Sequence, residues 1–302
     1  MIDRDMPAVP DNHTLVKTVA ASINHHDIWF LRGMGMPSEF PHVLGCDLAG
    51  TTPDGTAVVA HALIADVGRG GGDELLDPKR SMLADIGNGT FAEYVSVPTR
   101  NLVPKPDELE FVEAACLPTT FLTAYRMLFD RADIRPGNTV LVQGAGGGVS
   151  TAAVILGRAA GLKMWVTSRS EDKLKKSLDI GADAGFETGA RLPARVDAVL
   201  ETVGEATWEH SMRSVRPGGT IVVAGWTSGF KPTADLSRLA LGNVSIRGSA
   251  MGRTADLRSV LDLCSQDGVR PVIDATYTFE NAYEGFARLA AGEVFGKLVV
   301  TP

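Results

Sequence analysis

This chain of 302 residues has few cysteines, no long apolar run and no apolar segment at its start, and each of these features excludes a class of protein. It contains three cysteines, Cys46, Cys116 and Cys264, which are widely spaced and form no CxxC pair. This pattern predicts no disulfide framework and is typical of a reducing, cytoplasmic compartment. The sequence has no apolar run of about 18 residues, so no membrane span is expected. Residues 1–5 also lack the apolar core of a secretory signal peptide.

Positive charge is not in excess either, because the formal net charge is −7. A nucleic-acid surface or a basic membrane patch needs clustered Lys and Arg side chains, so we expect neither kind of partner. No internal repeat or long low-complexity segment is present. The length exceeds one typical hydrophobic core and predicts two domains. These exclusions leave a small-molecule substrate as the expected partner.

A glycine-rich turn is the most informative segment of the chain. It reads Gly144-Ala145-Gly146-Gly147-Gly148-Val149-Ser150 and follows the apolar run 139–142. Apolar residues then recur at helical spacing over 149–160. Because glycines let a backbone approach a pyrophosphate and a helix N-terminus favours its charge, this strand–turn–helix pattern predicts a dinucleotide site. Val149 or Ser150 replaces the third glycine of the strict motif, and a small Ser still permits close helix–strand packing.

Strand and helix patterns alternate through the middle of the chain. Predicted strands cover residues 140–144, 164–167, 198–202, 220–224 and 244–247, and predicted helices cover 150–161, 170–180, 206–215 and 234–241. The Arg-Pro-Gly-Gly sequence at 216–219 predicts a turn between a helix and the next strand. This alternation is typical of an α/β fold with a doubly wound parallel sheet.

The two ends of the chain have a different, β-rich pattern. Residues 15–21 alternate as a strand, residues 65–89 form a polar, Gly-rich excursion, and 296–300 predict a final strand. We therefore expect an irregular β-rich domain built from residues 1–110 and 270–302. The sheet domain, residues 111–269, is then inserted between these two parts.

Seven segments, in order along nearly the whole chain, resemble motifs of the medium-chain dehydrogenase/reductase superfamily. They are Ser22–Asp27, Leu44–Gly50, Gly89–Val95, Leu117-Pro118 with Thr123–Tyr125, the glycine turn, Arg216–Gly219 and Gly296-Lys297. The resemblance implies an oxidoreductase with a Rossmann cofactor domain and a GroES-like catalytic domain. The chain is similar to the zinc-free quinone-oxidoreductase branch, or to a zinc-type alcohol dehydrogenase that has lost its metal ligands.

The resemblance also implies positions for metal ligands, and this chain departs from them. The three catalytic-zinc positions carry Asn24, Cys46 and Thr119. A catalytic zinc takes three His, Cys or carboxylate ligands. Only Cys46 qualifies, and the alternative is that it is a small buried hydrophobic residue. The family's structural zinc uses four closely spaced cysteines in the segment matching 65–89, which has none. We therefore predict no bound metal.

The end of the second Rossmann strand predicts which nicotinamide cofactor binds. An acid there favours NAD, whereas a neutral or basic patch accommodates the 2′-phosphate of NADP. This chain has Ser168 and Arg169 at that point and Lys173 one turn later, so we predict NADPH. The alternative is a solvated helix start with incidental basic residues. The resemblance also implies that four further residues lie beside the nicotinamide: Thr202, Val203, Gly225 and Trp226.

Two residues are candidates for catalysis. The resemblance places His26 where zinc-type relatives carry the Ser or Thr of a proton relay. Histidine titrates near neutral pH, so His26 is predicted as the proton donor. A structural histidine hydrogen-bonded near Asp27 is the alternative. Asn24 is predicted to hydrogen-bond a carbonyl or the nicotinamide ribose, or else to cap a turn.

The leading hypothesis is a zinc-independent, NADPH-dependent oxidoreductase that transfers hydride to quinones or activated enones. Such acceptors carry their own activation and need no Lewis acid. The alternatives are an alcohol dehydrogenase or carbonyl reductase of the zinc-type family, and a non-catalytic NADPH-binding redox sensor or partner subunit. The apolar strand 244–247, expected at the sheet edge, predicts a homodimer formed through the sheet domain.

Overall fold

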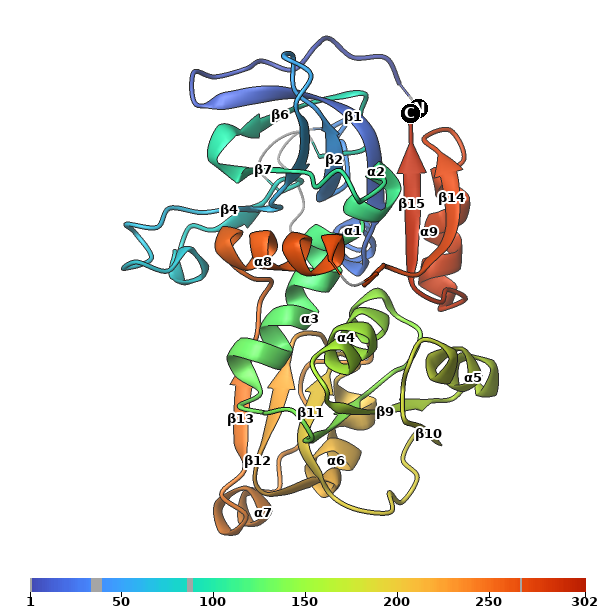
Figure 1. Cartoon of the computed structure of the whole chain (residues 1–302). Coiled ribbons are helices and arrows are strands. Elements are labelled where there is room, and N and C mark those ends of the chain that lie inside the picture. Colours follow the sequence, from blue (N-terminus) through green and yellow to red (C-terminus); the bar gives the residue numbers. More distant parts are fainter. Residues whose placement is uncertain (1, 34–39, 86–88, 267) are drawn as a thin grey trace. The chain divides into compact units, whose positions relative to one another are not determined.

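The computed structural model describes residues 2–33, 40–85, 89–266 and 268–302 (Figure 1). The chain divides into two compact units. Unit 1 contains the residues up to Leu122 together with Arg253–Pro302, and unit 2 contains Thr123–Gly252. The β-rich unit is thus built from both chain ends, and the α/β unit is a continuous middle segment.

Unit 1 consists of short strands, short helices and irregular segments. Its elements are β1 (His13–Ile23), α1 (His25–Leu31), β2 (Asp47–Thr51), β3 (Ala57–Ala60), β4 (Leu63–Ile64), η1 (Glu74–Leu76), β5 (Ser81–Met82), β6 (Tyr94–Pro98), η2 (Thr99–Asn101), β7 (Leu102–Pro104), α2 (Phe111–Ala114), η3 (Leu117–Phe121), α8 (Thr254–Ser265), β14 (Ile273–Thr278), α9 (Ala282–Ala291) and β15 (Lys297–Thr301).

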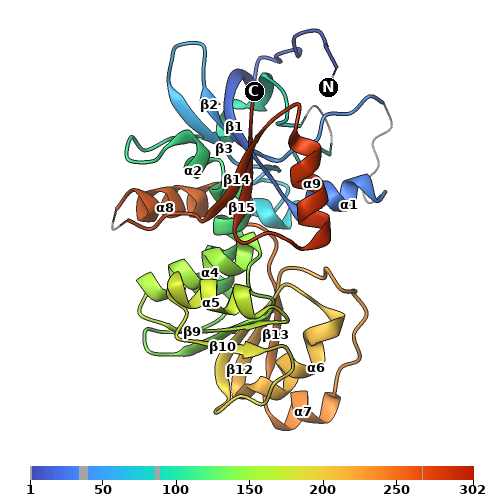
Figure 2. The ribbon, with the colours of Figure 1, turned by 90° about the vertical axis from the view of Figure 1, so that its right-hand side faces the viewer.

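Strand β1 organises the main sheet of unit 1. The described residues form a sheet of order β14-β15-β1-β2-β3-β7, and β6 also pairs with β1. The predicted strand 15–21 is confirmed as the middle of β1, whose Val16 enters a core with Leu48, Val58 and Val97. Strand β15 pairs antiparallel with the end of β1, at Ala21 opposite Val300. Figure 2 shows α1 and α9 side by side, and these two helices contact each other. The start of α1 is therefore held by elements from both chain ends.

Two segments, 111–122 and 253–269, pack in the β-rich unit 1. The sequence-based prediction had assigned both of them to the sheet domain. Helix α2 contacts β1 and β2, and α8 contacts η3 and β7. These contacts lie within unit 1. Helical periodicity predicts that such segments bury one face but does not say which sheet covers it.

The segment from Asp66 to Lys79 is held by a buried carboxylate. Asp77 accepts hydrogen bonds from Nε and Nη2 of Arg69, at 3.1 and 2.8 Å, and from the backbone N–H groups of Asp66 and Lys79. The Arg69 hydrogen bond is the largest influence and holds the pKa of Asp77 well below its usual range. This ion pair ties together a segment in which the cysteines of a structural zinc are absent.

Unit 2 is a doubly wound parallel sheet, as predicted. Its elements are α3 (Leu122–Arg126), η4 (Met127–Arg131), β8 (Thr139–Val142), α4 (Gly148–Ala159), β9 (Lys163–Ser168), α5 (Glu171–Asp179), β10 (Ala184–Glu187), β11 (Val196–Glu201), α6 (Glu205–Ser214), β12 (Val215–Val223), α7 (Leu236–Leu241) and β13 (Ser245–Gly248).

The strand order in unit 2 is β10-β9-β8-β11-β12-β13, and every neighbouring pair is parallel. Helices α4 and α5 cover one face of this sheet and α6 lies on the other (Figures 1 and 2). Strand β13 lies at the edge, where the sequence predicted it. Strand β10 at the opposite edge was not predicted, because its Ala-Gly-Phe-Glu sequence is short and only partly buried.

The turn predicted at 216–219 is wrong in detail, because these residues lie inside β12. Pairing with β11 passes from Val215 to Thr220 while the partner advances only from Val196 to Ala198. Residues 216–219 therefore form a bulge, and Gly218 adopts a φ of 71° there. Proline and glycine disrupt the ladder as expected, but they do not end it.

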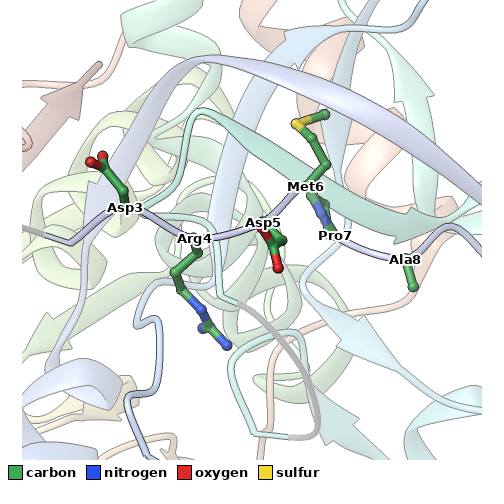
Figure 3. A pocket seen from close by; sticks show the side chains of 6 residues that line it. All are labelled: Asp3, Arg4, Asp5, Met6, Pro7 and Ala8. Carbon is green, nitrogen blue, oxygen red and sulfur yellow. The ribbon is translucent and has the colours of Figure 1, made fainter.

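Two further features of the described residues bear on function. None of their helices combines the length and the apolar character needed to cross a membrane. A hollow is lined by Asp3, Arg4, Asp5, Met6, Pro7 and Ala8, which follow one another on a single extended segment (Figure 3). Because its lining is local and mostly exposed, this hollow brings no distant chemical groups together.

Candidate functional site

The glycine turn has the geometry of an anion site. Gly144 and Gly146 adopt φ values of 79° and 98°, which favour glycine. A Cβ on Gly144 would lie 2.5 Å from Cγ2 of Val203, so a larger residue cannot fit there. Gly147 is the N-cap of α4, and Ser150 donates to its carbonyl oxygen at 2.8 Å. The first turn of a helix presents backbone N–H groups without intrahelical partners, which suits a pyrophosphate.

Two other predicted segments lie beside this turn. The backbone N–H of Ser228 donates to the carbonyl oxygen of Val203 at 2.8 Å. A Cβ on Gly225 would lie 2.7 Å from the carbonyl oxygen of Thr202. Trp226 follows directly and is 39% exposed. The structure therefore brings together the glycine turn, residues 202–203 and residues 225–226 at one end of the parallel strands.

The residues predicted to select the cofactor lie at the end of β9. Ser168 ends that strand, and its Oγ accepts from the backbone N–H of Ser170 at 3.1 Å. A hydroxyl that accepts one hydrogen bond can still donate one. Arg169 is exposed, and the stem of Lys173 lies over the glycine turn, since a Cβ on Gly146 would meet its Cδ at 2.7 Å. Hydroxyl and basic groups thus share this corner of unit 2.

A buried chain of polar side chains lies beneath these segments, and sequence reasoning missed it. Thr167 donates to Gln143 at 2.6 Å, Gln143 donates to Ser211 at 3.0 Å, and Ser211 donates to Glu201 at 2.6 Å. Glu201 in turn accepts from the backbone N–H groups of Val203 and Gly204, both at 2.9 Å. All four side chains are fully buried. The available signal was a polar residue directly after an apolar strand run, as at Gln143 and Glu201.

In unit 1, Asn24 belongs to a buried hydrogen-bond network. Its Nδ2 donates to Oδ2 of Asp47 at 2.8 Å and to the carbonyl oxygen of Ser22 at 3.2 Å. Its Oδ1 accepts from Nζ of Lys297 at 2.6 Å. Thr119 donates to Oδ1 of Asp47 at 2.6 Å. The amide group of Asn24 is thus engaged within unit 1, and its predicted contact with substrate or ribose stays a prediction.

The other predicted catalytic residue, His26, lies between a carboxylate and a thiol. Its Nε2 is 3.2 Å from Oδ1 of Asp85, and its Nδ1 is 3.4 Å from Sγ of Cys46. The His26 side chain is 25% exposed. Burial lowers the pKa of His26, but the hydrogen bond and charge of Asp85, with the charges of Asp27 and Asp47, outweigh it and raise this pKa. Burial raises the pKa of Asp85, but the hydrogen bond and charge of His26 act against burial, and the pKa of Asp85 is lowered overall.

Asp27 and Cys46 complete this cluster. Asp27 closes the first turn of α1, because its Oδ2 accepts from the backbone N–H of Asn24 at 2.8 Å. Its Oδ1 accepts from the backbone N–H of Gly45 at 3.1 Å. Burial raises the pKa of Asp27 to about 6 and raises that of the Cys46 thiol well above its usual value. Asp85, the carboxylate partner of His26, lies in the polar segment 65–89, where the sequence gave no signal of this contact.

Comparisons with known proteins agree with this architecture. Residues 10–107 match the alcohol dehydrogenase GroES-like domain family, and residues 148–266 match the zinc-binding dehydrogenase family. The zinc-type alcohol dehydrogenase-like protein YogA of Leptosphaeria maculans is 30% identical, over 97% of this chain and 92% of that protein. The 2-methylene-furan-3-one reductase of Solanum lycopersicum is 29% identical, over 98% of this chain and 74% of that protein.

Two solved structures are also similar. A NAD-dependent alcohol dehydrogenase superimposes with a TM-score of 0.92 and 32% identity, covering 100% of this chain and 95% of that one. The 2-octenoyl-CoA carboxylase reductase CinF, solved with NADP and 2-octenoyl-CoA, gives a TM-score of 0.88 and 25% identity, covering 98% and 80%. This chain therefore belongs to the medium-chain dehydrogenase/reductase superfamily, as its motifs predicted.

The zinc of zinc-type relatives does not fit the corresponding residues of this chain. Asn24 uses its amide for Asp47, Ser22 and Lys297, and the Thr119 hydroxyl donates to Asp47. Asn and Thr side chains are in any case outside the ligand set that catalytic zinc takes. Lys297 places an ammonium group 3.6 Å from Oδ2 of Asp47, where it adds positive charge to the network.

Proposed function

We propose that this protein is a zinc-independent, NADPH-dependent oxidoreductase that reduces quinones or carbonyl-conjugated alkenes. Membership of an oxidoreductase superfamily supports the general reaction class. The observation that carries the proposal is the combination of an intact glycine turn with an unsuitable set of residues at the zinc positions. Similarity to a 2-methylene-furan-3-one reductase and to a reductase solved with NADP and 2-octenoyl-CoA supports conjugated acceptors.

Unit 2 is proposed to hold the cofactor. The Cβ-free cradle at Gly144 and the start of α4 fit a pyrophosphate, and the hydroxyl of Ser168 fits the ribose end. Arg169 and Lys173 supply charge for a 2′-phosphate. When bound, NADPH supplies a hydride to the substrate. Residues 202–203 and 225–226 would position the nicotinamide through backbone groups, and the Glu201 carboxylate fixes the first of these segments.

Unit 1 is proposed to supply the proton. Reduction of a conjugated alkene leaves negative charge on the carbonyl side of the substrate, and a proton must follow. His26 is suited to this task because Asp85 stabilises its imidazolium form and fixes the ring. The proton on Nδ1 faces the thiol sulfur of Cys46, a weak acceptor, so it is proposed to be the one released to substrate. Asn24 and Lys297 position the first turn of α1, on which His26 lies.

The test is a substrate panel with the purified full chain after chelator treatment. We expect NADPH oxidation with cyclic enones and quinones and little oxidation of simple secondary alcohols with NADP⁺. A matched variant, Gly144→Val, should lose NADPH binding because its side chain would collide with Val203. Activity that requires added zinc and favours alcohols would replace this proposal with a zinc-type alcohol dehydrogenase. Tight NADPH binding without turnover on any acceptor would replace it with a non-catalytic cofactor-binding role.

A further inference from the structure

The side chains of His26, Asp27 and Cys46 form a cluster that proton transfer uses only in part. A ring nitrogen of His26, a carboxylate oxygen of Asp27 and Sγ of Cys46 lie within 4.8 Å of one another. Among the residues that the structure describes, no other group of three His, Cys, Asp or Glu side chains comes this close together. His26 and Asp27 come from α1, and Cys46 directly precedes β2. The cluster is therefore built by two adjoining elements of unit 1.

The spacing of His26 and Cys46 suits a single metal ion. Zinc binds a Cys sulfur at about 2.3 Å and a His nitrogen at about 2.0–2.1 Å, so tetrahedral ligands of these two kinds lie about 3.6 Å apart. The measured separation between Nδ1 of His26 and Sγ of Cys46 is 3.4 Å. These two donor atoms are thus already spaced as ligands of one ion.

The surroundings of the cluster also resemble those of a metal site. A histidine that binds a metal usually donates its other ring N–H to a carboxylate, which fixes the ring. Here Nε2 of His26 meets Asp85 at 3.2 Å, on the side away from Cys46. Each oxygen of Asp27 accepts one backbone hydrogen bond. A carboxylate offers about four lone-pair sites in total, so Asp27 retains the capacity to bind an ion.

We propose that His26, Asp27 and Cys46 bind a soft divalent transition-metal ion such as Zn²⁺, with water as a fourth ligand, and that this ion inhibits the protein. Binding releases the thiol proton of Cys46 to the solvent. The ion takes the lone pair at Nδ1 of His26, the atom that otherwise carries the transferable proton. This donor set shares Cys46 with the family's zinc positions but uses two residues of α1, His26 and Asp27, in place of Asn24 and Thr119. The inhibition rests on the proposed function, whereas the binding of metal does not.

Metal binding is tested without any substrate. Co²⁺ is titrated into the chelator-treated full chain while its absorption spectrum is recorded. We expect about one equivalent to produce a near-ultraviolet sulfur-to-cobalt band and the intense visible bands of a tetrahedral site. Cys46→Ser should abolish the sulfur band. The matched controls Cys116→Ser and Cys264→Ser should keep it, because neither of these buried thiols belongs to the cluster. Asp85→Asn should weaken Co²⁺ affinity about 10–100-fold, the usual effect of losing such a supporting carboxylate.

Inhibition is tested in a second arm. Zn²⁺ should slow NADPH-dependent enone reduction, a chelator should restore it, and Cys46→Ser should resist Zn²⁺ relative to its own metal-free rate. Three results would overturn the proposal: no Co²⁺ band in the wild type, a sulfur band that survives in Cys46→Ser, or an enone reduction rate that does not fall with Zn²⁺.

If the metal-free protein reduces no acceptor, the proposed function fails while the Co²⁺ spectrum still decides the site. If Cys46→Ser does not fold, cadmium NMR of the wild type reports whether one thiolate is a ligand, and a signal typical of oxygen and nitrogen ligands alone refutes the assignment.

Discussion

Removing the charge of Arg169 tests the cofactor assignment directly. Arg169 is exposed at the end of β9, next to Ser168, where the ribose of a bound dinucleotide is proposed to lie. A charge-assisted hydrogen bond contributes about 1.5–3 kcal/mol, and about 1.4 kcal/mol corresponds to a tenfold change in affinity. Because solvent screens an exposed guanidinium, we expect the lower end of this range. Arg169→Ala should therefore reduce the preference for NADPH over NADH about tenfold.

The assay is fluorescence titration of each variant with NADPH and with NADH, which gives the ratio of the two dissociation constants. Arg169→Ala should weaken NADPH binding and leave NADH binding nearly unchanged, because NADH lacks the 2′-phosphate. Lys175→Ala is the matched control: it removes an exposed charge from the same region, where Lys175 pairs with Glu171 at 2.9 Å. Raising the salt concentration should reduce the wild-type preference for NADPH over NADH, because salt screens the charge of Arg169. Equal affinity of the wild type for the two cofactors, or equal loss of both in Arg169→Ala, would refute the reasoning.

Four further outcomes are expected. His26→Asn should slow enone reduction by roughly 10²–10⁴, the contribution of a positioned acid, and slow quinone reduction less; an unchanged enone rate would make His26 structural. Chelation should not lower activity, and joint loss of zinc and activity would contradict this. Ile246→Asp, on edge strand β13, should turn a homodimer into a monomer by sedimentation at micromolar concentration, whereas a monomeric wild type would contradict the predicted interface. The pKa of Asp77 is lowered on folding, so its stabilising contribution is complete above about pH 4 and is lost as the pH falls through the folded pKa. Asp77→Asn should therefore unfold at a lower temperature than wild type near neutral pH, with the difference shrinking in acid; a constant difference would contradict it.

Features that depend on local geometry were predictable from sequence. The glycine turn was recognised because positive φ values and the close approach of Val203 require glycine. Strand β9 ends at Ser168 and Ser170 caps α5, as the pattern of polar residues indicated. The order of motifs identified the superfamily, because seven weak signals in the right sequence rarely coincide.

Features that depend on distant partners were not predictable. Asn24 and Lys297 are separated by 273 positions, so no local pattern announces their hydrogen bond. Asp85 was overlooked as the partner of His26 because it lies in an irregular segment whose polar residues look solvated. The boundaries of the two compact units also differ from the predicted domain boundaries. An amphipathic helix such as α8 fits any apolar surface of suitable shape, so its sequence does not say which unit it joins.

The pairing of β15 with β1 has a consequence for the order in which the protein forms during synthesis. Residues 123–252 are complete in the growing chain before residues 253–302 have been made. At about 5–20 residues per second, several seconds then pass before β15 emerges. During this interval unit 2 can fold, while β1 can pair with β2 and β6 but still lacks β15, and Asn24 lacks the ammonium of Lys297. A nascent chain arrested in this window is expected to bind dinucleotide before it can acquire the His26 site.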